Sequence, residues 1–183
     1  MVLKKIPVIV GDSILIRPHR FDDAIIVQEL LQDKYIQQNT INLESGFSKK
    51  EIESWILQLD EDFINGQRIV FCIEDKISKK MIGCIGLGLN YRFDSGDVFF
   101  WIGANFRKQG NCSEALAIVL NFAFTSLKLN RIEAQCFEFN DGSKNILLKN
   151  GFQFEGVKRD AVKKNGNYEN LCQFSILGKE FSR

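Results

Sequence analysis

The sequence holds little from which a metal site or a disulfide framework could be built. It has one histidine, His19, and five cysteines, an odd number with no two spaced as in a zinc or redox motif. Several of these cysteines stand inside apolar runs, where cysteine acts as a small core residue. We therefore expect a reduced protein without a bound metal.

The chain also lacks an excess of charge of one sign. It carries 24 lysines and arginines against 23 aspartates and glutamates, a formal net charge of +1. Binding DNA or RNA requires a basic field that neutralises phosphates, so direct nucleic-acid binding is not expected. The one basic cluster, residues 158–164, is interrupted by Asp160 and followed by Asn-Gly-Asn, which indicates a solvated turn.

Long apolar stretches are absent as well. No run approaches the roughly 20 residues that span a bilayer, so no membrane association through a spanning helix is expected. The first residues hold neither a long apolar region nor a small-residue cleavage site. Together these features predict a cytoplasmic protein.

What the chain does have is the size and composition of one ordinary domain. Its 183 residues are 45% hydrophobic and include 16 phenylalanines, which we expect to fill the core. Strands are expected at residues 14–18, 69–73, 81–87, 97–102, 132–137, 152–157 and 172–177. Helices are expected at residues 22–39, 48–65, 112–129 and 141–150. This order, without linkers or repeats, predicts a single mixed α/β domain over residues 1–183, with its core at about 14–177.

Local signals mark the ends of two of these helices. Ser48 with Glu51 three residues later forms a capping box, in which each side chain satisfies a free backbone donor. The apolar residues that follow recur on one helical face, and Gly66 ends that helix. Gly151 is likewise the expected left-handed stop of the last helix.

Residues 107–113 lie between a buried strand and the start of a long helix. The free amides of a helix N-terminus favour an anion, and Gly110 lets a phosphate approach the backbone closely. These features support a phosphate-binding loop, but they fit equally a Gly110 that only turns the chain into the helix. Neither the Walker A pattern nor the Rossmann glycine pattern is present, which argues against ATP hydrolysis and dinucleotide binding.

The same loop, Arg107-x-x-Gly110-x-Cys112, resembles the acetyl-CoA signature of the GNAT N-acetyltransferase superfamily. A second segment, Asn140-x-x-Ser143 followed by Leu147, Lys149 and Gly151-Phe152, is similar to one in the ribosomal-protein N-terminal (alanine/serine) acetyltransferase branch. Residues 129–134 and 154–157 agree with that branch, so the resemblance covers about residues 14–177. The chain departs from the pattern at Lys108, where the family often has glycine, and at Cys112, where it has glycine or alanine.

The resemblance implies an α/β fold with a mostly antiparallel central sheet flanked by helices, and acetyl-CoA as the co-substrate without a metal. It implies that the pyrophosphate is bound by the backbone amides of Gln109, Gly110, Asn111, Cys112 and Ser113, beside Arg107 and Lys108. It implies that the pantetheine arm pairs like an added strand with Trp101, Ile102 and Gly103. Asn140 and Asn145 are further candidates for cofactor contacts. From the residues alone, Trp101 also fits a core position and Asn140 also fits a helix cap.

The resemblance also implies that acetyl moves directly from the thioester to an amine, which needs an acid and a base. Ser143 is the candidate that protonates the departing thiolate, whose pKa in the free thiol is about 8.5. Asp97 is the first candidate for the base, because an acid in an otherwise apolar strand can have a raised pKa. Glu138 is the second candidate, and Tyr168 lies in a segment that resembles a substrate-side region. Asp97 fits a solvated strand end equally well.

Proton affinity bears on which amine is acetylated. An α-amine has a pKa of about 7.7–8.0 and lysine one of about 10.4, so at pH 7 lysine loses its proton at an extra cost of about 3.4 kcal/mol. A site without a strong base therefore suits the α-amine of a protein or peptide N-terminus. A small amine such as a polyamine or an antibiotic, and a non-catalytic acetyl-CoA-binding domain, remain alternatives. No acidic run offers a pocket for a polycation, and the sequence leaves open whether the chain forms homo-oligomers.

Overall fold

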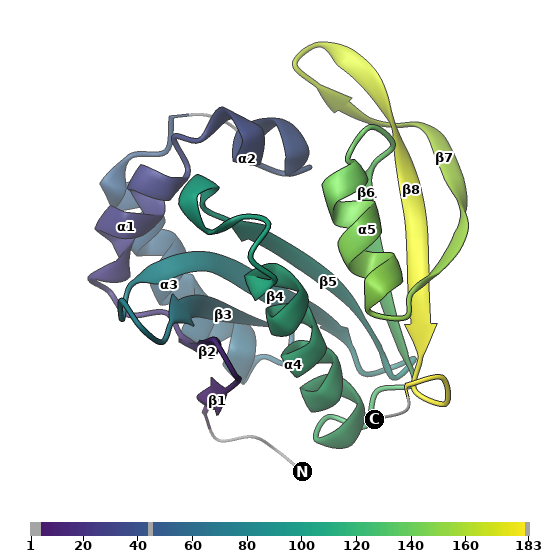
Figure 1. Ribbon diagram of the computed structural model, residues 1–183, viewed down its shortest axis with the longest axis horizontal. Coiled ribbons are helices and arrows are strands. Elements are labelled where there is room, and N and C mark those ends of the chain that lie inside the picture. The colour runs from purple at the N-terminus through teal and green to yellow at the C-terminus, as the bar shows by residue number, and fades with distance from the viewer. Residues whose placement is uncertain (1–4, 44–45, 182–183) are drawn as a thin grey trace.

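The computed structural model describes residues 5–43 and 46–181, which build one eight-stranded sheet with helices on both faces (Figure 1). The strands are β1 (Ile9–Val10), β2 (Ile14–Pro18), β3 (Arg68–Asp75), β4 (Met81–Asn90), β5 (Ser95–Ile102), β6 (Arg131–Phe137), β7 (Gln153–Lys164) and β8 (Asn167–Leu177). The helices are α1 (Asp23–Leu30), α2 (Lys34–Asn39), α3 (Lys49–Ile64), α4 (Asn111–Thr125) and α5 (Asp141–Lys149), with the short 3-10 turn η1 (Ala104–Phe106). The expected α/β fold is confirmed.

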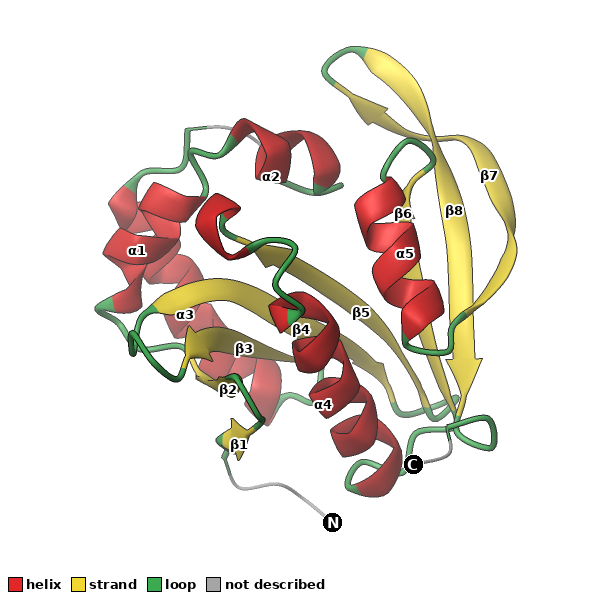
Figure 2. Cartoon of the chain, in the orientation of Figure 1, coloured by secondary structure: helices red, strands yellow, loops and turns green. Residues whose placement is uncertain are grey.

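The sheet order is β1-β2-β3-β4-β5-β6-β8-β7. Every neighbouring pair is antiparallel except β5 and β6, which run parallel. Helix α4 connects these two strands, as a parallel pair requires a crossover (Figure 2). The expectation of a mostly antiparallel sheet is therefore confirmed, and its one parallel step lies in the middle.

Two apolar clusters, one on each face, hold the helices to the sheet. The larger contains α4 and α5 residues together with side chains from β2 to β8, among them the fully buried Leu116, Leu120 and Phe71. The smaller joins α1 and α3 to the other face of β3 and β4. Phenylalanine is divided between core and surface: Phe137 and Phe174 are fully buried, whereas Phe93, Phe139 and Phe154 are exposed. Among the described residues no helix is long and apolar enough to cross a membrane.

Two expected elements differ from the observed ones. The helix expected over residues 22–39 is two helices, because Asp33 has an extended backbone and caps a new helix by accepting a hydrogen bond from Tyr35 N at 2.8 Å. The basic segment 158–164, expected to be a solvated turn, is the second half of β7. Its register shifts between Lys158 and Val162, which breaks the alternation that marks a strand.

His19 follows β2 and is buried, with its ring edge-on to Trp55 at a centroid distance of 5.1 Å. Burial lowers the pKa of His19 from 6.5 to about 4, and the attraction of Asp23 only partly opposes this. The unfolded chain therefore binds a proton that the folded chain rejects as the pH falls from 6.5 to 4. We expect the free energy of unfolding to decrease by up to about 3 kcal/mol across this window.

Urea unfolding of the wild type and of His19→Phe, at pH values from 7 to 4, measures how much unfolding free energy is lost through His19. Phenylalanine keeps a ring against Trp55 but does not titrate, so its unfolding free energy is expected to stay nearly constant down to about pH 4.5, where carboxylates begin to titrate. Equal losses in the two proteins between pH 6.5 and 4.5 would show that another group is responsible.

Candidate functional site

The parallel strands β5 and β6 pair over only three residues and then separate. Ser95, Gly96 and Asp97 face Arg131, Ile132 and Glu133, whereas β5 continues to Ile102 and β6 to Phe137. Beyond the paired residues β5 stays bonded to β4, and β6 stays bonded to β8, so the two halves of the sheet diverge (Figure 1). We call the divergence the wedge. Each of its sides is a strand edge that can pair with an extended ligand.

The direction of the backbone N–H and C=O groups decides which residues of β5 can bond a ligand in the wedge. Gly103 N donates to Ile82 O at 2.8 Å, on the β4 side. Hydrogen-bonding groups alternate sides along an antiparallel strand, so Trp101 also faces β4, while Ile102 and Phe100 face the wedge. The Trp101 side chain packs on the α1–α3 cluster. Of the three predicted pantetheine contacts, Ile102 is therefore the one whose backbone N–H faces the wedge. The N–H of Phe100, which was not predicted as a contact, faces the wedge as well.

The predicted phosphate loop leads from β5 into α4 at the open end of the wedge. Gly110 caps the helix with φ of +87°, and no side chain satisfies the helix start. The N–H groups of Asn111, Cys112 and Ser113 precede the first intrahelical bond and need an outside acceptor. Lys108 has φ of +59°, which explains why glycine is favoured at its position, and it is exposed together with Gln109 and Gly110.

Inside this loop, some side chains have structural partners. Asn111 accepts from Ser13 Oγ at 3.3 Å and donates to Phe106 O at 3.4 Å. Cys112 is 7% exposed, and burial raises the pKa of its thiol to about 12, so the small thiol packs as a neutral group. The Arg107 guanidinium contacts Asp33, Tyr35 and Ile102 O.

Helix α5 begins opposite this loop, on the β6 side. Asn140 is buried and its Oδ1 accepts from Ser143 N at 3.1 Å, so the helix-cap interpretation of Asn140 holds. Ser143 is partly exposed in the first turn of α5, and Asn145 is exposed on the same helix. At the other end of α5, Asn150 Nδ2 donates to Ser113 Oγ at 2.9 Å and links α5 to the start of α4. Asn150 belongs to the segment that resembles the ribosomal-protein branch, but it was not among the predicted site residues.

Asp97 stands where the wedge closes, paired in register with Glu133. Its carboxylate covers Gly88, because a Cβ there would lie 2.4 Å from Oδ1. The side chain still reaches solvent. Partial burial raises the pKa of Asp97, and the charge of Glu133 raises it further. A carboxylate with increased proton affinity, reachable from outside, is suited to accept a proton from an amine.

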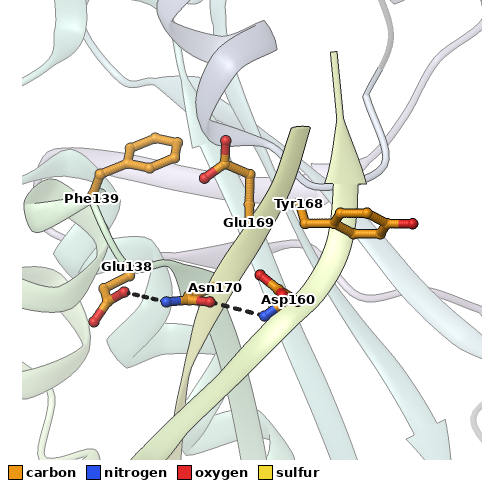
Figure 3. A pocket seen from close by; sticks show the side chains of 6 residues that line it. All are labelled: Glu138, Phe139, Asp160, Tyr168, Glu169 and Asn170. Carbon is orange, nitrogen blue, oxygen red and sulfur yellow. Dashed lines mark hydrogen bonds between the residues drawn. The ribbon is translucent and has the colours of Figure 1, made fainter. Parts of the chain in front are cut away.

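Glu138 lies in a different place. It follows β6 five residues beyond Glu133, roughly 16 Å away at about 3.3 Å per residue. With Asp160 of β7 and Glu169 of β8 it lines a pocket of about 340 Å³, which Phe139, Tyr168 and Asn170 complete (Figure 3). Asn170 bridges two of the acids: its Nδ2 donates to Glu138 Oε2 at 2.8 Å, and its Oδ1 accepts from Asp160 N at 2.9 Å. The structure therefore separates Asp97 from Glu138.

The pocket brings together acidic residues although the sequence has no acidic run. Its three carboxylates come from segments up to 31 positions apart, so no acidic run marks them in the sequence. Within the part of the chain that the structure describes, no cluster of three histidine, cysteine, aspartate or glutamate residues is arranged to hold a metal ion.

Comparisons with known proteins agree with this geometry. A family model described as an acetyltransferase (GNAT) domain matches residues 13–153. The uncharacterized N-acetyltransferase p20 of Bacillus licheniformis is 26% identical over 93% of this chain and 96% of its own.

Solved structures share the fold at lower identity. RimL, a ribosomal alpha-N-protein acetyltransferase in complex with coenzyme A, superposes with a TM-score of 0.86 at 17% identity, over 93% of this chain and 98% of its own. A spermidine N-acetyltransferase, SpeG of Vibrio cholerae in a chimera with hSSAT, superposes with a TM-score of 0.80 at 20% identity, over 92% and 97%.

Proposed function

The chain belongs to the GNAT acetyltransferase family, and on that premise we propose that it acetylates the α-amine of a protein or peptide N-terminus. It is an acetyl-CoA-dependent N-acetyltransferase. The observation that carries the proposal is the wedge with the uncapped N-terminus of α4 at its open end. We also propose that residues 1–183 form one transferase domain, since a single sheet extends from β1 to β8.

In this proposal the two ends of acetyl-CoA use different parts of the site. The pyrophosphate accepts hydrogen bonds from the amides of residues 109–113, and the exposed Lys108 adds positive charge. Arg107, paired with Asp33, has its charge neutralised. The pantetheine arm pairs with the free edge of β5 through Ile102 and Phe100, which directs the thioester toward the closed end of the wedge. Asn140 and Asn145 border the α5 side.

The acetyl group then moves directly from the thioester to the amine. The neutral amine nitrogen attacks the thioester carbonyl carbon, a C–N bond forms, and the C–S bond breaks. Asp97 takes the proton that the nitrogen releases and then passes it to solvent. The hydroxyl of Ser143 donates a proton to the departing thiolate and regains one from solvent water, so both residues return to their starting states. Asp97 is placed for this role because it lies at the closed end toward which the thioester points. Glu138 lies roughly 16 Å from that end, on the side where α5 and Ser143 begin, and is the alternative base if the thioester lies nearer that side.

The α-amine is favoured because the base is a carboxylate. Even with its raised pKa, Asp97 is a weak base beside a lysine amine of pKa about 10.4, whereas an α-amine at about 7.7–8.0 is partly neutral near pH 7. The acidic pocket supports a second candidate, a small polycationic amine. Glu138, Asp160 and Glu169 could hold ammonium groups beside the rings of Phe139 and Tyr168.

Thermal unfolding and thiol release test the function. Acetyl-CoA at about 100 times its Kd is expected to add about 2.7 kcal/mol of stability, and absence of any shift at millimolar cofactor would overturn the proposal. Three acceptors are then compared: a peptide with a free α-amine, the same peptide acetylated at its N-terminus but carrying a lysine, and spermidine. We expect release of CoA thiol with the first only. If the protein instead prefers spermidine, and the double variant Asp160→Asn/Glu169→Gln loses that preference, the acceptor is a small polycationic amine.

Ser143→Ala tests the proposed acid. The backbone N–H that bonds Asn140 is unchanged, so α5 is expected to fold and acetyl-CoA affinity to stay within about twofold. The rate of transfer is expected to decrease by about 100-fold, the lower end of the range for general acid catalysis. Equal decreases in rate and in cofactor affinity would assign Ser143 to binding. Asn145→Ala, which removes a candidate cofactor contact from the same helix, shows what a loss of binding looks like.

A further inference from the structure

Arg107 lies in the loop that the sequence motif assigns to phosphate, yet its side chain is engaged elsewhere. Its Nη2 pairs with Asp33 Oδ2, and its Nε donates to Ile102 O at 3.2 Å. Its Cζ lies 4.3 Å from the centre of the Tyr35 ring. Two of its five N–H groups are thus engaged, and the ion pair together with the ring stack holds the guanidinium beside α2.

Asp33 anchors α2 with both of its oxygens. Oδ1 accepts from Tyr35 N and caps the helix, while Oδ2 takes the Arg107 guanidinium. Helix α2 has only six residues and buries Ile36 alone. A helix of this length is not stable by itself, so its position depends on such anchors.

From this anchored start, α2 extends across the open end of the wedge toward the β6 side (Figure 1). A Cβ on Gly142 would lie 2.9 Å from the Tyr35 hydroxyl, so the phenol touches the first turn of α5, next to Ser143. Beyond the other end of α2, Lys164 of β7 donates to Thr40 O at 2.9 Å and to Leu43 O. Helix α2 thus contacts both diverging halves of the molecule.

We propose that Arg107 is a positioning residue that fastens α2 across the open end of the wedge. The loop that binds the cofactor and the helix whose Tyr35 contacts the start of α5 beside Ser143 are then joined by one side chain. Loss of the Arg107–Asp33 pair frees α2 and Tyr35, which impairs acceptor binding and leaves the phosphate contacts intact. The part of this inference that concerns the acceptor rests on the proposed function, whereas the fastening of α2 does not.

The test compares Arg107→Gln, Asp33→Asn and the double variant. Asparagine still caps α2 but removes the charge that holds Arg107, so it is the matched change on the other side of the pair. Hydrogen exchange of the α2 amides, measured without cofactor, is expected to become about tenfold faster in each single variant. The double variant is expected to exchange no faster, because both changes remove one interaction. Arg107→Lys should not restore slow exchange, since lysine has neither the fork nor the planar stack.

Calorimetry with acetyl-CoA and acceptor kinetics complete the test. Both single variants are expected to keep the Kd for acetyl-CoA within about twofold while KM for the peptide acceptor rises about tenfold. If Arg107 binds phosphate instead, Arg107→Gln alone weakens acetyl-CoA binding, Asp33→Asn does not, and α2 exchange is unchanged; that result overturns the inference. Failure of the wild type to bind acetyl-CoA would overturn the proposed function, while the exchange experiment would still decide the role of Arg107.

Discussion

Asp97→Asn is expected to lower the rate of acetyl transfer at pH 7 by about 10²- to 10⁴-fold, the usual contribution of a general base. Asparagine has the shape of aspartate and can cover Gly88 in the same way, but it cannot accept the proton that the amine releases. Because the residue lies where β5 and β6 meet, away from the phosphate loop, the Kd for acetyl-CoA is expected to change little. Calorimetry and thiol release measure the two quantities separately.

The pH dependence of the transfer rate is an independent test of Asp97 as the base. Asp97 acts as a base only when ionised, so the wild-type rate falls as the pH drops through its pKa. Burial and Glu133 raise that pKa, so the fall is expected at higher pH than for an ordinary aspartate. Glu133→Gln removes the second cause and should move the fall to lower pH. In Asp97→Asn this limb of the profile should vanish.

Glu138→Gln is the matched control for Asp97→Asn. It removes a carboxylate from the other half of the sheet, roughly 16 Å from the closed end of the wedge. Acetylation of a peptide α-amine is expected to continue at nearly the wild-type rate. A loss in Glu138→Gln as large as that in Asp97→Asn would show that the acid pocket, and not the closed end of the wedge, holds the reacting amine.

Local signals made much of the fold predictable. The capping box of Ser48 and Glu51 placed α3 within a residue of its observed start, since both reciprocal bonds form between neighbours in sequence. Gly151, with φ of +87°, ends the last helix as expected. Asn165-Gly166 is an equally local hairpin signal. It led us to expect that the whole basic segment is a turn, whereas the turn is confined to Asn165-Gly166 and the lysines before it belong to β7.

The parts of the site that could not be predicted depend on contacts between distant segments. The carboxylates of the acid pocket come from the end of β6, the irregular middle of β7 and the start of β8, and each one looks like an ordinary surface charge in sequence. Arg107 was assigned to phosphate because of its place in the motif, but Asp33, 74 positions earlier, determines where its side chain lies. The separation of β5 from β6 is likewise absent from either strand's own pattern. β5 is apolar from Val98 to Ile102 and β6 alternates polar and apolar residues from Arg131 to Cys136, as strands do that stay paired along their whole length.

Arg17→Ala is expected to reduce the free energy of unfolding by about 3–5 kcal/mol, the cost of breaking a buried ion pair from one side. The Arg17 guanidinium binds Asp23 at 2.7 Å and 2.9 Å and Glu74 at 2.6 Å, which ties the start of α1 to β2 and β3. Only 6% of its side chain is exposed. Removing it leaves two buried carboxylates unpaired, and a domain stable by about 5–15 kcal/mol loses much of its margin. Urea unfolding at pH 7 measures the change.

Two comparisons separate charge from packing in this loss. Arg131 also binds two carboxylates, Glu133 and Glu155, but 28% of its side chain is exposed, so Arg131→Ala should cost about 1 kcal/mol or less. Arg17→Met combined with Asp23→Asn and Glu74→Gln removes all three charges and keeps the volume, and should recover most of the stability lost in Arg17→Ala. If the triple variant is as unstable as Arg17→Ala, lost bonds to Pro18 O and to the α1 start, and not unpaired charge, account for the effect. Recovery would show that the loss in Arg17→Ala comes from the two buried carboxylates that it leaves unpaired.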